Sequence, residues 1–128
     1  MRTKARIIKE GSAKGKALTS KEPLSFYGGV DPETGVVIEK KHPLKGKSIK
    51  GRILVFPTGK GSTVGSYILY RLKKNGHAPL GIINQKSEPI VAVGAIISDI
   101  PMVDQVDIKK LKNGANITIK GEVVEWKN

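Results

Sequence analysis

Residues 53–83 carry the clearest structural pattern in the chain and read ILVFPTGKGSTVGSYILYRLKKNGHAPLGII. The run Ile53–Phe56 is apolar at every position, which is typical of a strand that is covered on both faces, and Pro57 ends it. Leu80–Ile83 is a second apolar run of strand length. The two runs predict neighbouring strands in the interior of a sheet.

The segment between these runs predicts a helix. Val64, Ile68 and Leu72 recur at four-residue spacing, so they share one face, and Asn75-Gly76 forms a helix C-terminus. The whole stretch therefore predicts a strand–turn–helix–strand unit with a right-handed crossover.

The rest of the chain is dominated by strand and turn signals. Residues 2–8 alternate as a half-buried strand does, and the Gly- and Pro-rich residues 11–48 predict short strands joined by turns. Residues 89–97 are apolar throughout, so their periodicity does not distinguish a strand from a helix. Residues 115–119 and 122–126 predict a closing pair of strands. We expect a mixed, β-rich α+β fold and a single domain over residues 1–128.

The composition of the chain limits which classes of function are possible. The chain has 128 residues, a formal charge of +12 and no cysteine, so it cannot supply thiolate ligands to a metal or cluster. No segment has the length of a membrane span or the pattern of a signal peptide, and we expect a cytoplasmic protein. His42 and His77 lie in turn-like surroundings and are interpreted as solvated loop residues. The charge fits a nucleic acid, an anionic substrate or an acidic partner.

The glycine turn before the predicted helix is the candidate site. Its residues do not match a phosphate-binding P-loop, because the Gly59-Lys60 pair is followed by Gly61, and a dinucleotide fingerprint fails because Gly65 falls one residue late. Glycines let a backbone approach a ligand closely, and a helix N-terminus offers free N–H groups to an anion. Ser62 stands at that point. Spacing alone leaves two interpretations open, a helix cap and a hydroxyl that carries negative charge.

Four segments of the chain resemble the small subunits of the aconitase X family. They are GGVDPETGVV (28–37), HPLKGKSIKGRILVFPTGKGSTVGSYILYRL (42–72), NGHAPLGIIN (75–84) and VAVGAIISDIPMVD (91–104), with GKGSTVGS as the diagnostic part. The resemblance implies a swivelling β/β/α domain that belongs to the archaeal form of the aconitase X enzymes. It also implies a larger partner subunit that binds a [4Fe-4S] cluster, while this chain binds no cofactor.

The implied reaction is the dehydration of mevalonate 5-phosphate, an anionic phosphorylated substrate, in archaeal isoprenoid synthesis. Ser62 matches the family serine that removes a proton from the substrate carbon. Around it, Gly59, Lys60, Gly61 and Thr63 are candidates to support the substrate or the serine alkoxide. Two alternatives are another aconitase X hydro-lyase, such as a hydroxyproline dehydratase, and a basic β-rich module that binds nucleic acid. The six scattered aromatic residues argue against the second of these.

Overall fold

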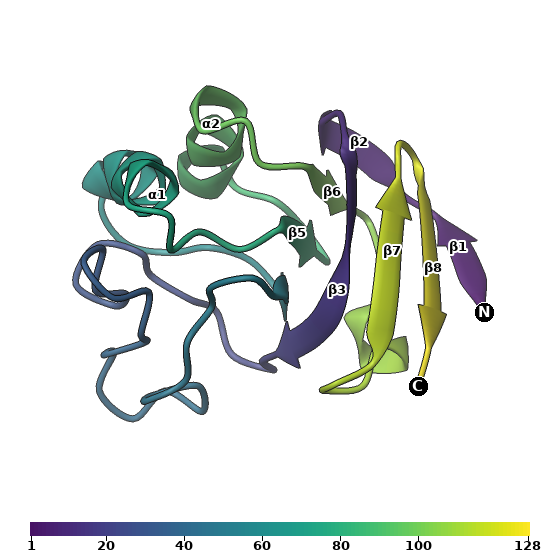
Figure 1. Ribbon diagram of the computed structural model, residues 1–128, viewed down its shortest axis with the longest axis horizontal. Coiled ribbons are helices and arrows are strands. Elements are labelled where there is room, and N and C mark those ends of the chain that lie inside the picture. The colour runs from purple at the N-terminus through teal and green to yellow at the C-terminus, as the bar shows by residue number, and fades with distance from the viewer.

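Eight strands form one continuous sheet in the computed structural model, which describes residues 1–128. The strands are β1 (Arg2–Lys4), β2 (Arg6–Lys9), β3 (Ser12–Thr19), β4 (Ile53–Phe56), β5 (Gly81–Asn84), β6 (Met102–Asp104), β7 (Asn116–Lys120) and β8 (Val123–Lys127). Their order in the sheet is β1-β8-β7-β3-β4-β5-β6-β2. The two outermost strands, β1 and β2, are separated in sequence by Ala5 alone, so the sheet folds back and nearly closes on itself (Figure 1).

Strand β3 joins two differently built halves of this sheet. Residues 12–16 pair with β7 in antiparallel orientation, whereas residues 17–19 pair with β4 in parallel orientation. On one side, β7, β8 and β1 form antiparallel pairs, and on the other, β4, β5 and β6 run parallel. The helices α1 (Val64–Lys74) and α2 (Pro89–Ile97) lie beside the parallel half (Figure 1). The arrangement is the predicted β/β/α layering, and the strand–turn–helix–strand unit is confirmed.

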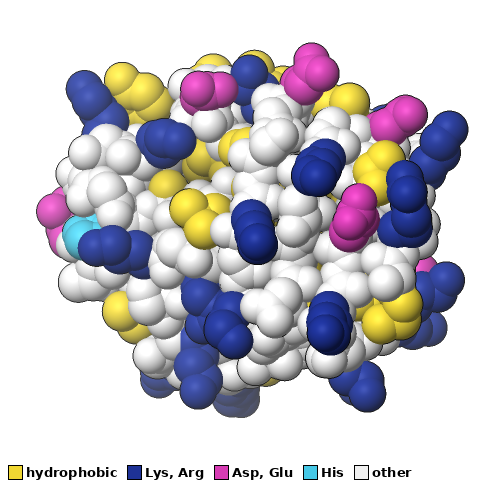
Figure 2. Space-filling view, turned by 45° about the vertical axis from the view of Figure 1, so that its right-hand side comes forward, with side chains coloured by type: hydrophobic (Ala, Val, Ile, Leu, Met, Phe, Trp, Pro, Cys, Tyr) yellow, Lys and Arg dark blue, Asp and Glu magenta, His cyan; other side chains and the backbone are white.

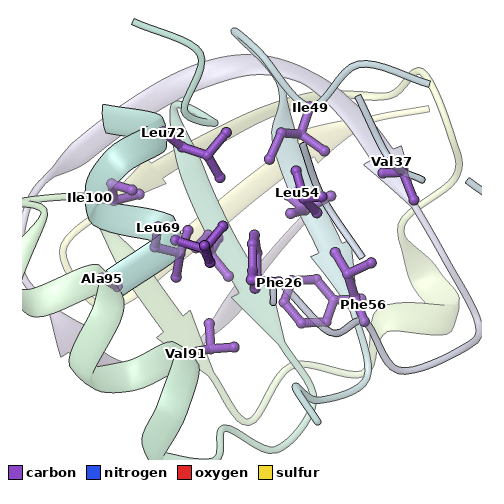
Figure 3. Close-up of a cluster of buried hydrophobic side chains, with 14 of the residues drawn as sticks. Phe26, Val37, Ile49, Leu54, Phe56, Leu69, Leu72, Val91, Ala95 and Ile100 are labelled. Carbon is purple, nitrogen blue, oxygen red and sulfur yellow. The ribbon is translucent and has the colours of Figure 1, made fainter. Parts of the chain in front are cut away.

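The buried parallel strands divide their side chains between two cores. In β4, Ile53 and Val55 belong to a cluster of 12 residues between the two halves of the sheet, because alternate side chains point to opposite faces. Leu54 and Phe56 belong to a cluster of 17 residues under the helices (Figure 3). In that cluster the rings of Phe26 and Phe56 meet edge to face, with centroids 6.2 Å apart. A strand covered on both faces is what the apolar run predicts.

The segment 89–97, which the pattern left open, is a helix. Glu88 caps it, since its carboxylate accepts hydrogen bonds from the backbone N–H groups of Ile90 at 2.8 Å and Val91 at 2.7 Å. Pro89 occupies the first turn, where its missing N–H costs nothing. Gly94 lets α2 approach α1 closely, because a Cβ there would lie 2.6 Å from Leu69 Cδ1.

Three expectations for the remaining segments were wrong. Residues 12–19 form one long strand, although Gly11, Gly15 and the lysines gave them a loop-like composition. Between β3 and β4 the chain makes only isolated bridges in place of the short strands: Val30 with Val37, Val36 with Ser48, and Leu24 with Gly59 of the glycine turn. His42 is buried and not solvated: its Nδ1 accepts from the Leu44 N–H at 3.0 Å, and Nε2 lies 3.0 Å from the Pro23 carbonyl.

The long connection from β3 to β4 is nevertheless well packed. Its apolar side chains enter the larger core beneath the helices, which orders the loop without a hydrogen-bonded ladder. The buried members are Leu24, Phe26, Val30, Val37, Leu44 and Ile49. This packing places the first part of the loop, near Leu24, beside the glycine turn. Neither helix has the length and apolar composition that crossing a bilayer would require.

Candidate functional site

The glycine turn lies where β4 ends and α1 begins. Ser62 is partly exposed there, and its Oγ accepts a hydrogen bond from the Val64 N–H at 3.2 Å. Its carbonyl accepts from the Gly65 N–H at 2.9 Å. Thr63 is the N-cap residue of α1 but makes no capping bond with its side chain, so Ser62, one residue earlier, supplies the side-chain acceptor that one interpretation predicted. A hydroxyl oxygen that already accepts an N–H bond is also better able to carry negative charge.

Three consecutive N–H groups in this turn have no acceptor within the chain. They belong to Gly61, Ser62 and Thr63, which stand immediately before the first residue of α1. Unpaired N–H groups at a helix N-terminus, together with the positive end of the helix dipole, favour an anion. The turn therefore presents a partly exposed hydroxyl beside unused hydrogen-bond donors.

The two glycines of the turn are required by close neighbours. A Cβ at Gly59 would overlap the Glu88 carboxylate and the Val91 side chain at the start of α2. Gly61 has φ +95°, and a Cβ there would overlap Ser25 Oγ. Close approach to the protein's own loops explains both glycines, so no ligand is needed to account for them.

Lys60 is engaged by a residue that the sequence did not single out. Its Nζ lies 2.8 Å from Glu39 Oε2, and the Glu39 side chain is only 19% exposed. Burial acts to raise the pKa of Glu39, but the hydrogen bonds from Lys60 and from the Ser25 N–H, together with the positive charge of Lys60, bring the pKa below its ordinary value. In this conformation the Lys60 ammonium is compensated by Glu39, and support of Ser62 by Lys60 remains a prediction.

The pair Gly28-Gly29 has a physical role in the structure, because it allows a close approach of the loop to Glu39. A Cβ at Gly29 would overlap the Ser25 carbonyl oxygen and lie 3.0 Å from Glu39 Oε1. Gly28 has φ +78°, a value that glycine adopts at little cost. These glycines let the loop fold tightly against Glu39. Paired glycines in a loop often indicate a close backbone approach, and this is the one sequence signal near Glu39, but it does not identify the carboxylate.

A shallow, basic groove of about 530 Å³ adjoins Lys60. It is lined by Glu22, Glu39, Lys40, Lys41, His42, Pro43 and Lys60. A larger groove of about 920 Å³ shares Glu22 and Pro43 with it and lies near the ends of β3 and β4. On the side of the molecule toward β7 and β8, lysine and arginine side chains are scattered and interspersed with acidic ones (Figure 2). The positive charge is spread over the surface and is not confined to the site.

No group of three or more His, Cys, Asp or Glu side chains is placed to hold a metal ion. The buried Asp104 is held instead by Arg6, with Nε and Nη2 at 2.9 and 2.7 Å from its two carboxylate oxygens. Ser87 donates its N–H to the same carboxylate at 3.0 Å. Asp104 therefore stabilises the pairing of β2 with β6 and binds the backbone of Ser87, just before α2.

Comparisons with known proteins find relatives that match nearly the whole chain. The family model described as aconitase X swivel domain matches residues 2–126. Relatives named phosphomevalonate dehydratase small subunit include one from Methanosarcina acetivorans, 57% identical over 94% of this chain and 86% of that relative. Another, from Thermococcus kodakarensis, is 57% identical over 95% of this chain and 92% of the relative.

Two solved structures have the same fold. The crystal structure of Thermococcus kodakaraensis aconitase X in its holo-form superimposes with a TM-score of 0.97 at 54% identity, covering 100% of this chain and 99% of that one. The solution NMR structure of a UPF0107 protein superimposes with a TM-score of 0.90 at 48% identity, with full coverage of both chains.

Proposed function

Since this chain belongs to the aconitase X swivel domain family, we propose that it is the small subunit of a hydro-lyase that dehydrates mevalonate 5-phosphate to trans-anhydromevalonate 5-phosphate. Relatives that are 52–58% identical over 84–97% of their length carry the name of that enzyme's small subunit. The observation that carries the role of this chain is the Ser62 hydroxyl, partly exposed and bonded to the Val64 N–H beside three free N–H groups.

In this proposal Ser62 accepts the proton that leaves the substrate carbon. A serine hydroxyl is about as weak an acid as water, so lowering its pKa to near neutrality takes on the order of 10 kcal/mol of differential stabilisation. A helix terminus supplies about 0.3–2 kcal/mol. The remainder requires further donors, cations and exclusion of water. We infer that Ser62 becomes basic only when a partner subunit covers the turn.

The residues of this chain do not fit a [4Fe-4S] cluster, because it has no cysteine and no cluster of other ligands. A cluster would need its ligands from the large subunit, as the resemblance implies. We further propose that residues 1–128 move as one domain. The pairing of β1 with β8, which ties the first residues to the last, supports this. The cytoplasmic location expected from the sequence stays a prediction.

A nucleic-acid-binding module is the weaker candidate. The exposed aromatic side chains are Tyr27, in a loop, and Tyr67, on α1, while Phe26, Phe56 and Trp126 are buried. Modules that stack bases carry exposed aromatics on adjacent strands of one sheet face. The exposed aromatics of this chain do not form such a platform.

The test is reconstitution of this chain with the large subunit, with turnover of mevalonate 5-phosphate followed by ³¹P NMR. We expect no turnover by either subunit alone. Ser62→Ala should reduce kcat of the pair by 100-fold or more, as loss of a general base does, and should lower stability by only about 1 kcal/mol.

The matched control is Ser66→Ala, one helical turn further along α1. Ser66 Oγ donates to the Ile90 carbonyl at 2.6 Å, so its loss also removes one hydrogen bond but none at the turn. The control should retain activity. Near-normal turnover by Ser62→Ala would remove Ser62 from the mechanism, and turnover of hydroxyproline in place of mevalonate 5-phosphate would favour the other hydro-lyase.

A further inference from the structure

Glu39 connects three segments that are distant in sequence. Its Oε2 accepts from Lys60 Nζ at 2.8 Å, and its Oε1 accepts from the Ser25 N–H at 3.1 Å. Its own N–H donates to the Gly29 carbonyl at 3.2 Å. One mostly buried carboxylate thus joins the Gly28-Gly29 loop, the Ser25 backbone and the glycine turn.

The contacts made by the main chain run between the same segments. The Lys60 N–H donates to the Leu24 carbonyl at 3.2 Å, and the Leu24 N–H donates to the Thr58 carbonyl at 3.3 Å. Gly61 lies against Ser25, where a Cβ would overlap Oγ. The position of Ser25 therefore bears on Gly61, and Gly61 directly precedes Ser62.

The ion pair of Glu39 with Lys60 differs from an ion pair on the exposed surface. Glu39 is only 19% exposed, so its interaction with Lys60 is screened less than that of an exposed pair. Its lowered pKa keeps the carboxylate ionised at neutral pH. The exposed ion pair of Lys4 with Glu122, by contrast, has side chains that are 83% and 58% exposed, and a pair of this kind contributes little to stability.

We propose that Glu39 is a positioning residue for Ser62: it fixes Lys60 and Ser25, and through them the backbone that carries the serine. This inference rests on the proposed function, in which Ser62 is the proton acceptor. A displacement of about 1 Å in a reacting group can cost about 100-fold in rate. A looser turn should therefore lower kcat more than it changes KM.

The experiment compares Glu39→Gln with Glu33→Gln. The first variant removes the charge but retains an oxygen that can accept from Ser25. The second breaks the exposed ion pair with Arg71, so it is a matched loss of one carboxylate charge away from the turn. The amide ¹H–¹⁵N shifts of the free chain are recorded, and kcat and KM are measured on the reconstituted pair.

For Glu39→Gln we expect shift changes at Ser25, Gly29 and residues 60–63, with a fall in kcat of about 10-fold and less than threefold change in KM. Glu33→Gln should leave both kcat and these amides unchanged. Lys60→Met should lower kcat by the same factor, whereas Lys60→Arg should keep most of the wild-type kcat. The double variant Glu39→Gln with Lys60→Met should have a kcat no lower than that of Lys60→Met alone.

Unchanged amide shifts at residues 60–63, a kcat of Glu39→Gln within twofold of wild type, or additive effects of the two substitutions would each overturn the inference. The two proposals fail separately. If the wild-type pair does not turn over mevalonate 5-phosphate, the proposed function is wrong, while the shifts of the free chain still decide whether Glu39 holds the turn.

Discussion

The substitution Gly61→Ala tests how tightly Ser25 packs against the glycine turn that carries Ser62. Gly61 has φ +95°, and left-handed backbone costs a non-glycine residue about 1–2 kcal/mol. The smaller entropy of an alanine in the unfolded chain returns about 0.4–1 kcal/mol. The backbone contribution is therefore about 1 kcal/mol. In addition, the new Cβ forces Ser25 Oγ away from its hydrogen bond to the Tyr27 carbonyl, 3.0 Å long, which costs about 1 kcal/mol.

Gly61→Ala should thus lower the free energy of unfolding by about 2 kcal/mol in total, and Gly46→Ala should lower it by about 1 kcal/mol. Gly46 is the matched control because its φ is +87° and a Cβ there would meet no atom within 4 Å. Urea unfolding of the free chain measures both values, provided that the m-value is unchanged. In a Ser25→Ala background, the cost of Gly61→Ala should fall most of the way to that of Gly46→Ala, because the overlap with Oγ is removed while the tight contact with the Cβ of residue 25, at 3.3 Å, remains.

Two results would refute this reasoning. One is an equal cost for Gly61→Ala and Gly46→Ala in the wild-type background, which would mean that Ser25 does not press on the turn. The other is a cost for Gly61→Ala that Ser25→Ala does not reduce. At this chain length a difference of 1 kcal/mol corresponds to about 4 °C in Tm, so thermal unfolding gives an independent check.

Two further substitutions test the sheet and the helix layer. Asp104→Asn should destabilise the fold by about 2 kcal/mol at pH 7, since hydrogen bonds to a charged group are lost. Burial acts to raise the pKa of Asp104, but the hydrogen bonds from Arg6 and Ser87 bring the pKa below its ordinary value. The stability that the ionised Asp104 contributes is therefore present above about pH 3.9 and is lost as the pH falls through the pKa of the folded state. Urea unfolding should show the difference from wild type shrinking below pH 4, and a difference that grows there would contradict the assignment. Gly94→Ala should cost about 1–2 kcal/mol by urea unfolding, since its Cβ would lie 2.6 Å from Leu69 Cδ1, whereas Val93→Ala on the exposed side of α2 should change stability by less than about 0.5 kcal/mol.

The parts of the fold with a strong local pattern could be predicted from the sequence. Ile53–Phe56 is buried at every position, as a wholly apolar run should be. Of the predicted apolar positions of α1, Ile68 and Leu72 are buried, whereas Val64 at the first residue of the helix is 42% exposed. β3 was missed because its first residues, Ser12–Lys16, pair with β7 at the outer half of the sheet. There, small and charged side chains are tolerated on the exposed face, and pairing between distant segments outweighs local propensity.

The site could be predicted only in part, for a related reason. Ser62 follows from local signals, a glycine turn and the start of a helix. Glu39 lies 23 positions earlier in a loop without periodicity, and its role depends on the packing of Leu24 and Phe26 into the core. A contact between an isolated carboxylate and a lysine leaves no spacing rule in the sequence. The buried His42 was misjudged similarly, because neighbouring Pro43 suggests a turn whether the turn is exposed or covered.

The surroundings of the turn determine how Ser62 can reach a partner subunit. On one side, Gly59 is in contact with Glu88 and Val91 at the start of α2, and on the other, Lys60 and Gly61 are held by Glu39 and Ser25. A turn fixed on both sides cannot swing as a free loop without breaking these contacts and opening the α2 cap. Closure over a substrate therefore requires that the sheet and both helices move together with Ser62. In the proposed function, where Ser62 is the base and residues 1–128 move as one domain, such a motion would bring the serine to the substrate with its N–H donors already in place and so keep the preorganisation that a weak base needs.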